Sequence, residues 1–239
     1  ENKIALVTGS SRGIGRAVAL RLAQEGAVVA INHPGEPAAA SEVVGRIESE
    51  GGRAVAFEAD MGRPEQVRTM VERVTAELGP IQILVNNAGI CPFHDFLTLP
   101  EDLWDHVHDV NLKGAFVCSQ AVARTLVSRK LPGRFVFMSS ISAWVGGATQ
   151  VHYTTTKAGM SSLMQSLAIA LAPHGIQCNA ILPGSILTDI SRDVLQPGSE
   201  LRTYFEKRIP VGRLGEPDDI AGVAAFLCSD AAEMMVGQT

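Results

Sequence analysis

Tyr153 and Lys157 stand four residues apart, and Ser140 lies thirteen residues before the tyrosine. Side chains at an i, i+4 spacing share one face of a helix. A phenol with a pKa near its usual value of about 10 is a poor base at neutral pH, but a neighbouring ammonium group lowers that pKa. The pair could then exchange a proton with an alcohol or carbonyl group. An isolated Tyr-x-x-x-Lys is more often a surface pair on an amphipathic helix, so the surrounding elements must decide.

The elements that position these residues begin with an apolar run at 135–138, which is typical of a buried parallel strand. Ser140 would then follow the end of a strand, and Tyr153 would start a helix that continues through the apolar segment 158–171. A strand-end serine and a helix-start tyrosine can meet at one substrate oxygen. A helix that is apolar nearly all round requires burial on several sides, which a subunit interface would supply.

The N-terminal part of the chain predicts a nucleotide-binding unit. A short apolar strand at 4–7 runs directly into TGSSRGIG at 8–15, and a helical pattern follows until Gly26, before a second strand at 28–31. In such a unit, glycines let the backbone approach a pyrophosphate at the helix N-terminus. The position between strand and helix makes this signal stronger than a loose glycine pattern, which is more often a plain turn.

The rest of the chain alternates between strands and helices, without repeats, low-complexity tracts or an interdomain linker. Further strands are expected at 54–57, 81–85 and 176–182, and further helices at 38–50, 64–78, 100–123 and 217–229. This alternation predicts a single α/β domain over residues 1–239, with helices on both faces of a parallel sheet. The polar segment at about 186–212 lacks strand periodicity and is interpreted as a lid over the substrate.

Composition and charge exclude several classes of protein. The chain has 239 residues, of which 46% are hydrophobic, and this is enough for a full core. Its net charge of −5 and pI near 5.7 argue against a nucleic-acid partner, because no block of lysines and arginines stands out. No apolar run reaches the roughly 20 residues that span a bilayer, and no charged-then-apolar leader begins the sequence. We therefore expect no membrane contact and a cytoplasmic location.

The cysteines and histidines predict no metal site. The chain has four cysteines, Cys91, Cys118, Cys178 and Cys228. They are far apart and form no C-x-x-C pair, so reduced thiols in the core are expected rather than a zinc site or a disulfide framework. His106 and His108 are two positions apart on an expected helix and would point to different faces.

Five motifs, in this order along nearly the full chain, resemble those of the short-chain dehydrogenase/reductase family. They are the glycine turn at 8–15, Asn86-Asn87-Ala88-Gly89, Asn111, the set of Ser140, Tyr153 and Lys157, and Pro183-Gly184. The one departure is Thr156, where the family often has serine before the lysine, and a hydroxyl is kept.

This resemblance implies a Rossmann-type, doubly wound sheet of seven parallel strands, in the order 3-2-1-4-5-6-7, with helices on both faces. The active site would lie outside the carboxyl ends of the strands. Residues 236–239 fall where relatives continue into the seventh strand, so we expect that C-terminal strand to be missing.

The resemblance also implies that Asn111, Ser140, Tyr153 and Lys157 catalyse reversible hydride transfer between C4 of a nicotinamide and a substrate carbon. Tyr153 would take the proton of the alcohol, Ser140 would bond and orient the same oxygen, and Lys157 would support the phenolate and bond the nicotinamide ribose. Asn111 would hold a water that links the lysine to solvent. Without the resemblance, an asparagine inside a helical pattern indicates a local kink. No metal is required.

The cofactor contacts follow from the same resemblance. They are Gly9, Ser11, Arg12, Gly13, Ile14, Gly15, Asn32, His33, Asp60, Met61, Asn87, Ala88, Gly89, Tyr153, Lys157, Pro183, Gly184, Ile186 and Thr188. Asp60 would meet the adenine ring, although a helix cap before Pro64 is equally natural.

The residues after the second strand indicate which nicotinamide cofactor is bound. An acidic residue there would bond the ribose 2′-hydroxyl and repel a 2′-phosphate. The chain has Asn32 and His33 at this place, and Glu36 stands a little too late. With Arg12 as a possible phosphate partner, the sequence favours NADP over NAD. An asparagine can bond a ribose hydroxyl as well, and Arg12 can simply pair on the surface.

Within the family, the stretches 86–94 and 139–153 resemble those of aldose 1-dehydrogenases of the L-rhamnose type more than those of fatty-acid synthesis reductases. The candidate contacts for a small sugar substrate are Ser140, Ser142, Gln150, His152, Tyr153 and Ser185. Any one of them can equally serve to cap a loop. A polar site of this kind would reject analogues that lack the matching hydroxyls.

Three alternatives remain open from the sequence: a 3-oxoacyl-[acyl-carrier-protein] reductase, a general carbonyl reductase, and a non-catalytic regulator that senses NAD(P). Such regulators usually lose the tyrosine or the lysine, and this chain has both. Family members are commonly tetramers or dimers built on the helices expected at 100–123 and 158–171. A homotetramer or a dimer is therefore expected here.

Overall fold

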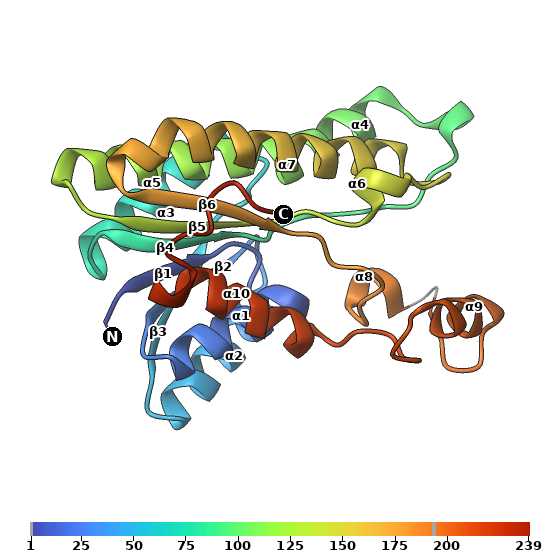
Figure 1. Cartoon of the computed structure of the whole chain (residues 1–239), viewed down its shortest axis with the longest axis horizontal. Coiled ribbons are helices and arrows are strands. Elements are labelled where there is room, and N and C mark those ends of the chain that lie inside the picture. The colour runs from blue at the N-terminus through green and yellow to red at the C-terminus, as the bar shows by residue number, and fades with distance from the viewer. Residues whose placement is uncertain (1, 193–194) are drawn as a thin grey trace.

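The computed structural model describes residues 2–192 and 195–239. Within them, six parallel strands form one sheet in the order β3-β2-β1-β4-β5-β6 (Figure 1). The strands are β1 (Ile4–Val7), β2 (Val28–His33), β3 (Arg53–Glu58), β4 (Ile81–Asn86), β5 (Gly133–Met138) and β6 (Ile176–Ile181). The strand order reverses between β1 and β4, and ligands of such sheets bind at the carboxyl ends beside this reversal.

Helices cover both faces of the sheet. One face carries α1 (Gly13–Gln24), α2 (Pro37–Ser49) and α10 (Pro217–Cys228), and the other carries α3 (Pro64–Glu77), α5 (Gly114–Arg129) and α7 (Val151–Leu171) (Figure 1). Beyond the carboxyl ends of the strands lie α4 (Glu101–His108), α6 (Ser142–Val145), α8 (Asp189–Arg192) and α9 (Glu200–Arg208). None of the helices in the described part of the chain is long and apolar enough to cross a membrane.

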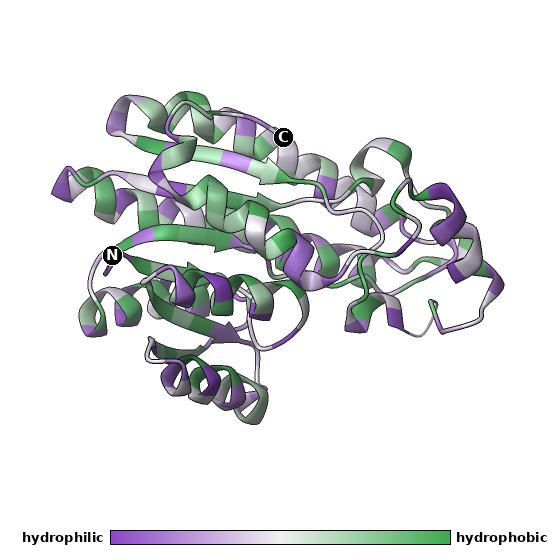
Figure 2. Cartoon of the chain, turned by 60° about the horizontal axis from the view of Figure 1, so that its bottom comes forward, coloured by the Kyte–Doolittle hydropathy of each residue, from purple (hydrophilic) through white to green (hydrophobic). Residues whose placement is uncertain are grey.

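The core explains why the strands are apolar. Ala5 and Val7 of β1 pack in the cluster under α1 and α10, whereas Ile4 and Leu6 pack in the cluster on the α3 and α5 side. A parallel strand buried on both faces reads as a continuous apolar run rather than an alternating one. Figure 2 shows this arrangement, with hydrophobic colour concentrated in the sheet and hydrophilic colour on the outer turns of the helices.

The sheet differs from the expected seven strands. Residues 2–192 and 195–239 form six, and the C-terminal segment lies beside the edge strand β6 (Figure 1). There, Gly237 N donates to the Cys178 carbonyl and Ala180 N donates to the Gln238 carbonyl, both at 2.8 Å. The side chain of Asn179 holds the same segment, since its Oδ1 accepts from Gln238 N at 3.0 Å. The segment lies where a seventh strand would pair, but two backbone hydrogen bonds do not make a strand.

The long helix expected at 100–123 is interrupted. A π-helical turn at Asp109–Lys113 joins α4 to α5 and contains Asn111. A local kink was indicated at this asparagine, and the structure has a π-helical turn there, a feature that often marks functional positions.

The segment interpreted as a lid contains α8 and α9, and residues 193 and 194 within it lie outside the described residues. Its two ends meet at the base. Leu187 N donates to the Gly215 carbonyl at 2.8 Å, and Gly215 N donates to the Ser185 carbonyl at 2.9 Å. These bonds fix the points where the segment leaves the end of β6 and where it leads into α10.

Candidate active site

Tyr153 and Lys157 lie in the first two turns of α7, as the sequence predicts. The Lys157 Nζ atom is 5.5 Å from the centre of the Tyr153 ring. The same atom donates a 2.7 Å hydrogen bond to the carbonyl of Met138, the last residue of β5. The sheet therefore fixes the position of the lysine, and the helix fixes the position of the tyrosine.

Ser140 follows β5 and is brought to the tyrosine. Its hydroxyl is near enough to lower the pKa of the Tyr153 phenol. Its Oγ also accepts two hydrogen bonds from Ser142, one from the backbone N at 3.1 Å and one from the hydroxyl at 2.9 Å. With its acceptor positions used in this way, Ser140 has its own proton left to donate.

The pKa of Tyr153 differs from the one expected. Burial raises it to about 12, the neighbouring Cys91 also raises it, and the hydrogen bond with Ser140 lowers it. Burial lowers the pKa of Lys157 to about 8, against a smaller raising effect from Cys91. The expectation that the ammonium lowers the tyrosine pKa is wrong here, because removal of the phenol from water is the larger effect.

Asn111 is wholly buried beside the lysine. Its Oδ1 accepts from Ile90 N at 2.8 Å, and its Nδ2 donates to the Ile90 carbonyl at 3.0 Å and to Thr156 Oγ1 at 3.2 Å. A Cβ built on Gly89 would lie 3.4 Å from both Asn111 Oδ1 and Lys157 Nζ. Both polar atoms therefore lie next to Gly89.

The glycine turn presents bare backbone at the start of α1. Gly9 and Gly13 have φ values of +61° and +57°, which favour glycine. A Cβ on Gly15 would lie 2.3 Å from the Gly9 carbonyl oxygen. In α1, all of whose residues are described, no side chain caps the N-terminus and no acidic residue occupies the first turn. An uncapped helix N-terminus behind glycines fits a pyrophosphate group, so this turn fits a dinucleotide.

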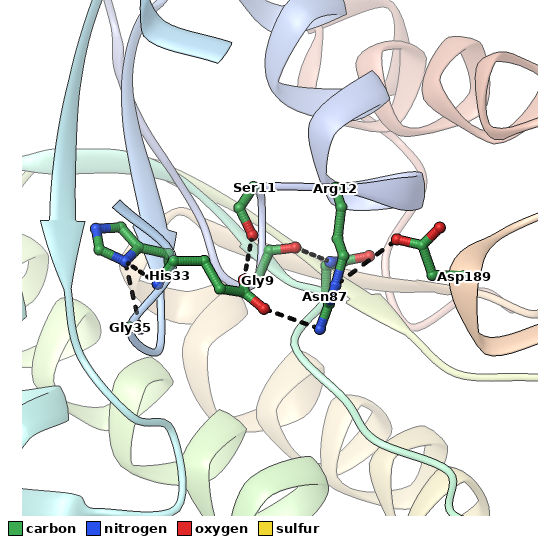
Figure 3. Close-up of polar contacts among 8 residues, drawn as sticks. Gly9, Ser11, Arg12, His33, Gly35, Asn87 and Asp189 are labelled. Carbon is green, nitrogen blue, oxygen red and sulfur yellow. Dashed lines mark hydrogen bonds and ion pairs between the residues drawn. The ribbon is translucent and has the colours of Figure 1, made fainter. Parts of the chain in front are cut away.

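Asn87 and Ala88 support the turn from β4. Asn87 Nδ2 donates to the carbonyls of Thr8 and Gly9 at 2.9 and 3.0 Å. In return, Thr8 Oγ1 accepts from the backbone N of Asn87 and of Ala88, both at 3.0 Å. These bonds tie the loop after β4 to the end of β1, and Figure 3 shows the contact of Asn87 with Gly9.

The residues after β2 are arranged differently from the expectation. Asn32 is buried, with its Oδ1 accepting from Gly9 N at 2.9 Å and its Nδ2 donating to the Ala59 carbonyl at 3.0 Å. Its amide thus joins β2 to the glycine turn and to the end of β3. His33 is also buried, and its Nδ1 accepts from Glu36 N at 3.1 Å.

The remaining expected cofactor residues line the same edge of the sheet. Asp60 Oδ1 accepts from Gly62 N at 2.8 Å. Met61 and Ile186 are buried, and the Pro183 carbonyl accepts from Ile141 N at 3.0 Å. The side chain of Thr188 borders the turn, because a Cβ on Gly13 would lie 3.7 Å from it.

The expected substrate residues divide into two groups. His152 is wholly buried, and its Nε2 lies 2.7 Å from the Pro92 carbonyl. This placement differs from the expected substrate contact, since the ring is enclosed and holds the loop after β4. Ser142 is also buried, and its hydroxyl donates a hydrogen bond to Ser140. Gln150 and Ser185 are half-buried and keep part of their surface open.

Two residues that the sequence did not single out for the site contribute to it. The Cys91 thiol accepts a 3.1 Å hydrogen bond from Gln150 Nε2 and influences the pKa of both Tyr153 and Lys157. Ser139 Oγ donates to the Lys157 carbonyl at 2.8 Å and so fixes α7 to the end of β5. The run of hydroxyls after the fifth strand was the available signal for Ser139. Among residues 2–192 and 195–239, no three metal-binding side chains gather at one place.

Known proteins resemble this chain over its full length. A family model described as enoyl-(acyl carrier protein) reductase matches residues 9–239. A relative from a Sphingomonas species, named L-rhamnose 1-dehydrogenase (NAD(P)(+)), is 49% identical over 237 residues, covering 99% of this chain and 93% of the relative. A 3-oxoacyl-[acyl-carrier-protein] reductase from Staphylococcus epidermidis is 40% identical over 238 residues, covering 100% of this chain and 96% of the relative.

A solved structure has the same fold. It is a gluconate 5-dehydrogenase from Burkholderia cenocepacia in complex with NADP and tartrate, and it is 34% identical to this chain. The match has a TM-score of 0.93 and covers 100% of this chain and 92% of the other. The predicted resemblance, including that to L-rhamnose 1-dehydrogenases, is confirmed. Full-length matches of this strength mean that the chain belongs to the short-chain dehydrogenase/reductase family of oxidoreductases.

Proposed function

We propose that this chain is an NAD(P)-dependent sugar 1-dehydrogenase, which oxidises L-rhamnose or an aldose of similar hydroxyl pattern at C1. The observation that carries the proposal is the 49% identity, over 99% of the chain, to a relative named L-rhamnose 1-dehydrogenase (NAD(P)(+)). The grouping of Ser140, Tyr153 and Lys157 at the carboxyl end of β5 supports the same chemistry. Both nicotinamide cofactors are proposed to bind, with NADP preferred.

Each of the four catalytic residues would have its own role in oxidation of the substrate alcohol. Tyr153, as phenolate, takes the hydroxyl proton, and Ser140 donates a hydrogen bond to the same oxygen. Lys157 carries positive charge beside the phenolate and would bond the nicotinamide ribose, while Asn111 lies beside the lysine on the proposed proton route to solvent. A bound nicotinamide would supply hydride acceptance at the substrate carbon.

The glycine turn is proposed to hold the cofactor. Backbone N–H groups at the N-terminus of α1 would bind the pyrophosphate, with Thr188 beside them. Asp60 and Met61 would border the adenine, and Pro183, Gly184 and Ile186 the carboxamide end. Gln150 and Ser185 are the proposed partners for sugar hydroxyls, because they keep open surface near the reactive group.

The proposed assembly is a homotetramer, or a dimer, built on α5 and α7. Two shallow hollows on the outer side of these helices are lined mainly by apolar side chains, among them Leu112, Phe116, Leu163, Leu167 and Leu171. The Phe116 side chain is 43% exposed in the single chain. A second copy of the same helices would remove this apolar surface from water.

We also propose a cytoplasmic location. All four cysteines of the chain are free and buried, as the sequence predicts. Burial raises the pKa of Cys118, Cys178 and Cys228 to about 12. Unpaired thiols are the usual state in a reducing compartment.

A second candidate function is reduction of a 3-oxoacyl thioester on a carrier protein. The 40% identical relative of that name favours it, and its reaction would use the same serine, tyrosine and lysine. The sugar reading is preferred because the identity to the L-rhamnose enzyme is higher over the same span.

A screen at 340 nm separates the two candidates. NAD and NADP are offered separately with L-rhamnose, other aldoses and simple alcohols, and NADPH is offered with an acetoacetyl thioester. Reduction of cofactor by a deoxy-aldose, abolished in Tyr153→Phe, is the expected result. Oxidation of NADPH by the thioester, with no reaction from any sugar, would replace the proposal by the acyl reductase.

A further inference from the structure

Three hydrogen bonds join the loop after β4, at 91–94, to the segment 149–152 at the start of α7. They are Gln150 Nε2 to Cys91 Sγ at 3.1 Å, His152 Nε2 to the Pro92 carbonyl at 2.7 Å, and His94 N to the Thr149 carbonyl at 2.9 Å. We call this group of bonds the clasp. Its two side-chain bonds connect residues 59 and 60 positions apart in the sequence. The clasp therefore fixes the loop after β4 against the helix that carries Tyr153.

His152 is the enclosed member of the clasp. Its side chain is wholly buried, and the carbonyl of Pro92 can only accept, so Nε2 carries the ring proton. In the described part of the chain, no group forms a hydrogen bond with Nδ1. The imidazole ring therefore makes a single hydrogen bond, and that bond holds the loop.

The carboxamide of Gln150 is in contact with the loop on one side and with Gly147 on the other. Nε2 donates to the Cys91 thiol, and a Cβ built on Gly147 would lie 2.5 Å from Oε1. A primary amide has two N–H donors and an oxygen that accepts. The bond to the thiol uses one donor, so the second N–H group and the oxygen are available to the hydroxyl groups of a ligand.

Gln150 is also fixed relative to the reactive tyrosine. It is the residue before α7, and its carbonyl accepts from the backbone N of Tyr153 at 2.9 Å and of Thr154 at 2.8 Å. Cys91 is close enough to the site to influence the pKa of both Tyr153 and Lys157. The thiol is therefore near the carboxamide and near the reactive pair.

We propose that Cys91 and His152 are positioning residues, which act through Gln150 to favour a substrate with several hydroxyl groups. His152 holds the loop, the loop carries the thiol, and the thiol orients the carboxamide beside the oxygen that reacts with Tyr153. A hydroxyl group next to the reacting carbon then meets a partner that is already in place, which lowers the cost of binding. The inference rests on the proposed function, because the ligand of Gln150 is the sugar proposed there.

Steady-state kinetics with L-rhamnose at saturating cofactor test the proposal. Cys91→Ala should raise KM about fivefold and change kcat by less than about twofold, since it removes a hydrogen bond from Gln150 and none from the reacting oxygen. Gly147→Ala should raise KM by a similar factor, because the added carbon displaces the end of a flexible side chain. His152→Leu should also raise KM, and His152→Gln, whose amide keeps a donor for the loop, should restore most of the loss.

The Gln150→Ala background separates a positioning role from a general loss of packing. Alone, this substitution should raise KM more than Cys91→Ala does. Cys91→Ala added to it should cause no further rise, because the thiol then has no carboxamide to orient. A rise in KM that multiplies in the double variant would overturn the inference.

Cys178→Ala is the matched control. Cys178 is wholly buried in β6, so loss of this thiol should lower the melting temperature and leave KM unchanged. An equal rise in KM in Cys178→Ala, or an unchanged KM in Cys91→Ala, Gly147→Ala and His152→Leu, would overturn the inference alone. If the unsubstituted protein oxidises no aldose with either cofactor, the proposed function fails, and the inference with it.

Discussion

The hydroxyl of Ser142 donates a 2.9 Å hydrogen bond to Oγ of Ser140, and the backbone N of Ser142 donates a second at 3.1 Å. Ser142 is therefore a positioning residue, which orients the serine that contacts the reacting oxygen. Because both bonds use acceptor positions of Ser140, the proton of Ser140 is left for donation to another oxygen, such as that of the substrate.

Substitution of Ser140 and of Ser142 by alanine should lower kcat by different amounts. Ser140→Ala removes the donor to the substrate oxygen and should lower kcat by about 10² to 10³. Ser142→Ala removes one of two orienting bonds and should lower kcat by about tenfold, with KM for the sugar unchanged. Steady-state kinetics with saturating cofactor measure both. A larger loss in Ser142→Ala than in Ser140→Ala would contradict the assigned order.

The buried charge of Lys157 should lower the free energy of unfolding. Its pKa falls from 10.5 in water to about 8 in the folded protein, which corresponds to about 3 kcal/mol. Between pH 8 and 10.5 the unfolded chain binds the additional proton, so this penalty applies fully below pH 8 and disappears as the pH rises through that window. Lys157→Met should therefore gain stability relative to the unsubstituted protein at pH 7, and about 2 kcal/mol of this gain should be lost by pH 10.

Urea unfolding at pH 7 and pH 10 measures this difference. The substitution also leaves the Met138 carbonyl without its donor, but that cost does not change with pH. Lys113→Met is the control, since Lys113 is 55% exposed and pairs with Asp109 on the surface. If the difference in free energy of unfolding between Lys157→Met and the unsubstituted protein stays constant with pH, the pKa of Lys157 is not lowered in the folded protein.

The rate of sugar oxidation should rise with pH. Burial raises the pKa of Tyr153 to about 12, so the phenolate fraction increases by about tenfold for each pH unit between pH 7 and 10. The opposite reaction requires the protonated phenol, which stays the dominant form below a pKa of about 12, so its rate should change little over the same range. A flat profile of kcat/KM for oxidation from pH 7 to 10 would contradict Tyr153 as the base.

Two glycines should respond in opposite ways to alanine. A Cβ on Gly15 would lie 2.3 Å from the Gly9 carbonyl and 2.5 Å from Asn87 Nδ2, so Gly15→Ala should abolish binding of ADP-ribose. Gly45 lies exposed inside α2 with nothing within 4 Å of the added atom. Gly45→Ala should therefore add about 1 kcal/mol of stability and raise the melting temperature by about 2 to 4 °C, without changing activity.

The face of α5 and α7 should control assembly. Phe116→Glu places a charge in the apolar hollow between these helices and should reduce the molar mass measured by light scattering after size-exclusion chromatography. Leu97→Glu is the control, because Leu97 is 87% exposed and lies in the segment between β4 and α4. An equal effect of both substitutions, or of neither, would argue against this face as the interface.

The sequence alone predicted the strands and most helices closely. The first strand was expected at 4–7 and is observed at Ile4–Val7. A strand that is covered on both faces is apolar throughout, and a glycine commonly follows the end of a helix. Both patterns can be recognised within a few consecutive residues of the sequence. The expected seventh strand is not observed, because the segment beside β6 makes only two backbone hydrogen bonds with it in the described part of the chain.

The positions of side chains were harder to predict than the helices and strands. Asn32 and His152 were expected at the cofactor and the substrate, but both are enclosed and bind backbone groups. Glu36 was expected to fall short, yet the turn held by His33 carries it to the glycine turn. Each outcome depends on contacts between segments distant in sequence. The pKa of Tyr153 was misjudged for a related reason, because burial cannot be estimated from spacing.

The π-helical turn at Asp109–Lys113 has a consequence for how this helix can vary. The turn accommodates one residue more than an α-helical path of the same length. Deleting one residue there would leave an α-helical turn over the same length, so α4 and α5 would merge into one regular helix and keep their faces. Val107, which is fully enclosed, would stay in the interior, whereas Asn111 within the turn would lose its present position. The extra residue of this stretch therefore serves the placement of Asn111, and the helices on either side do not depend on it.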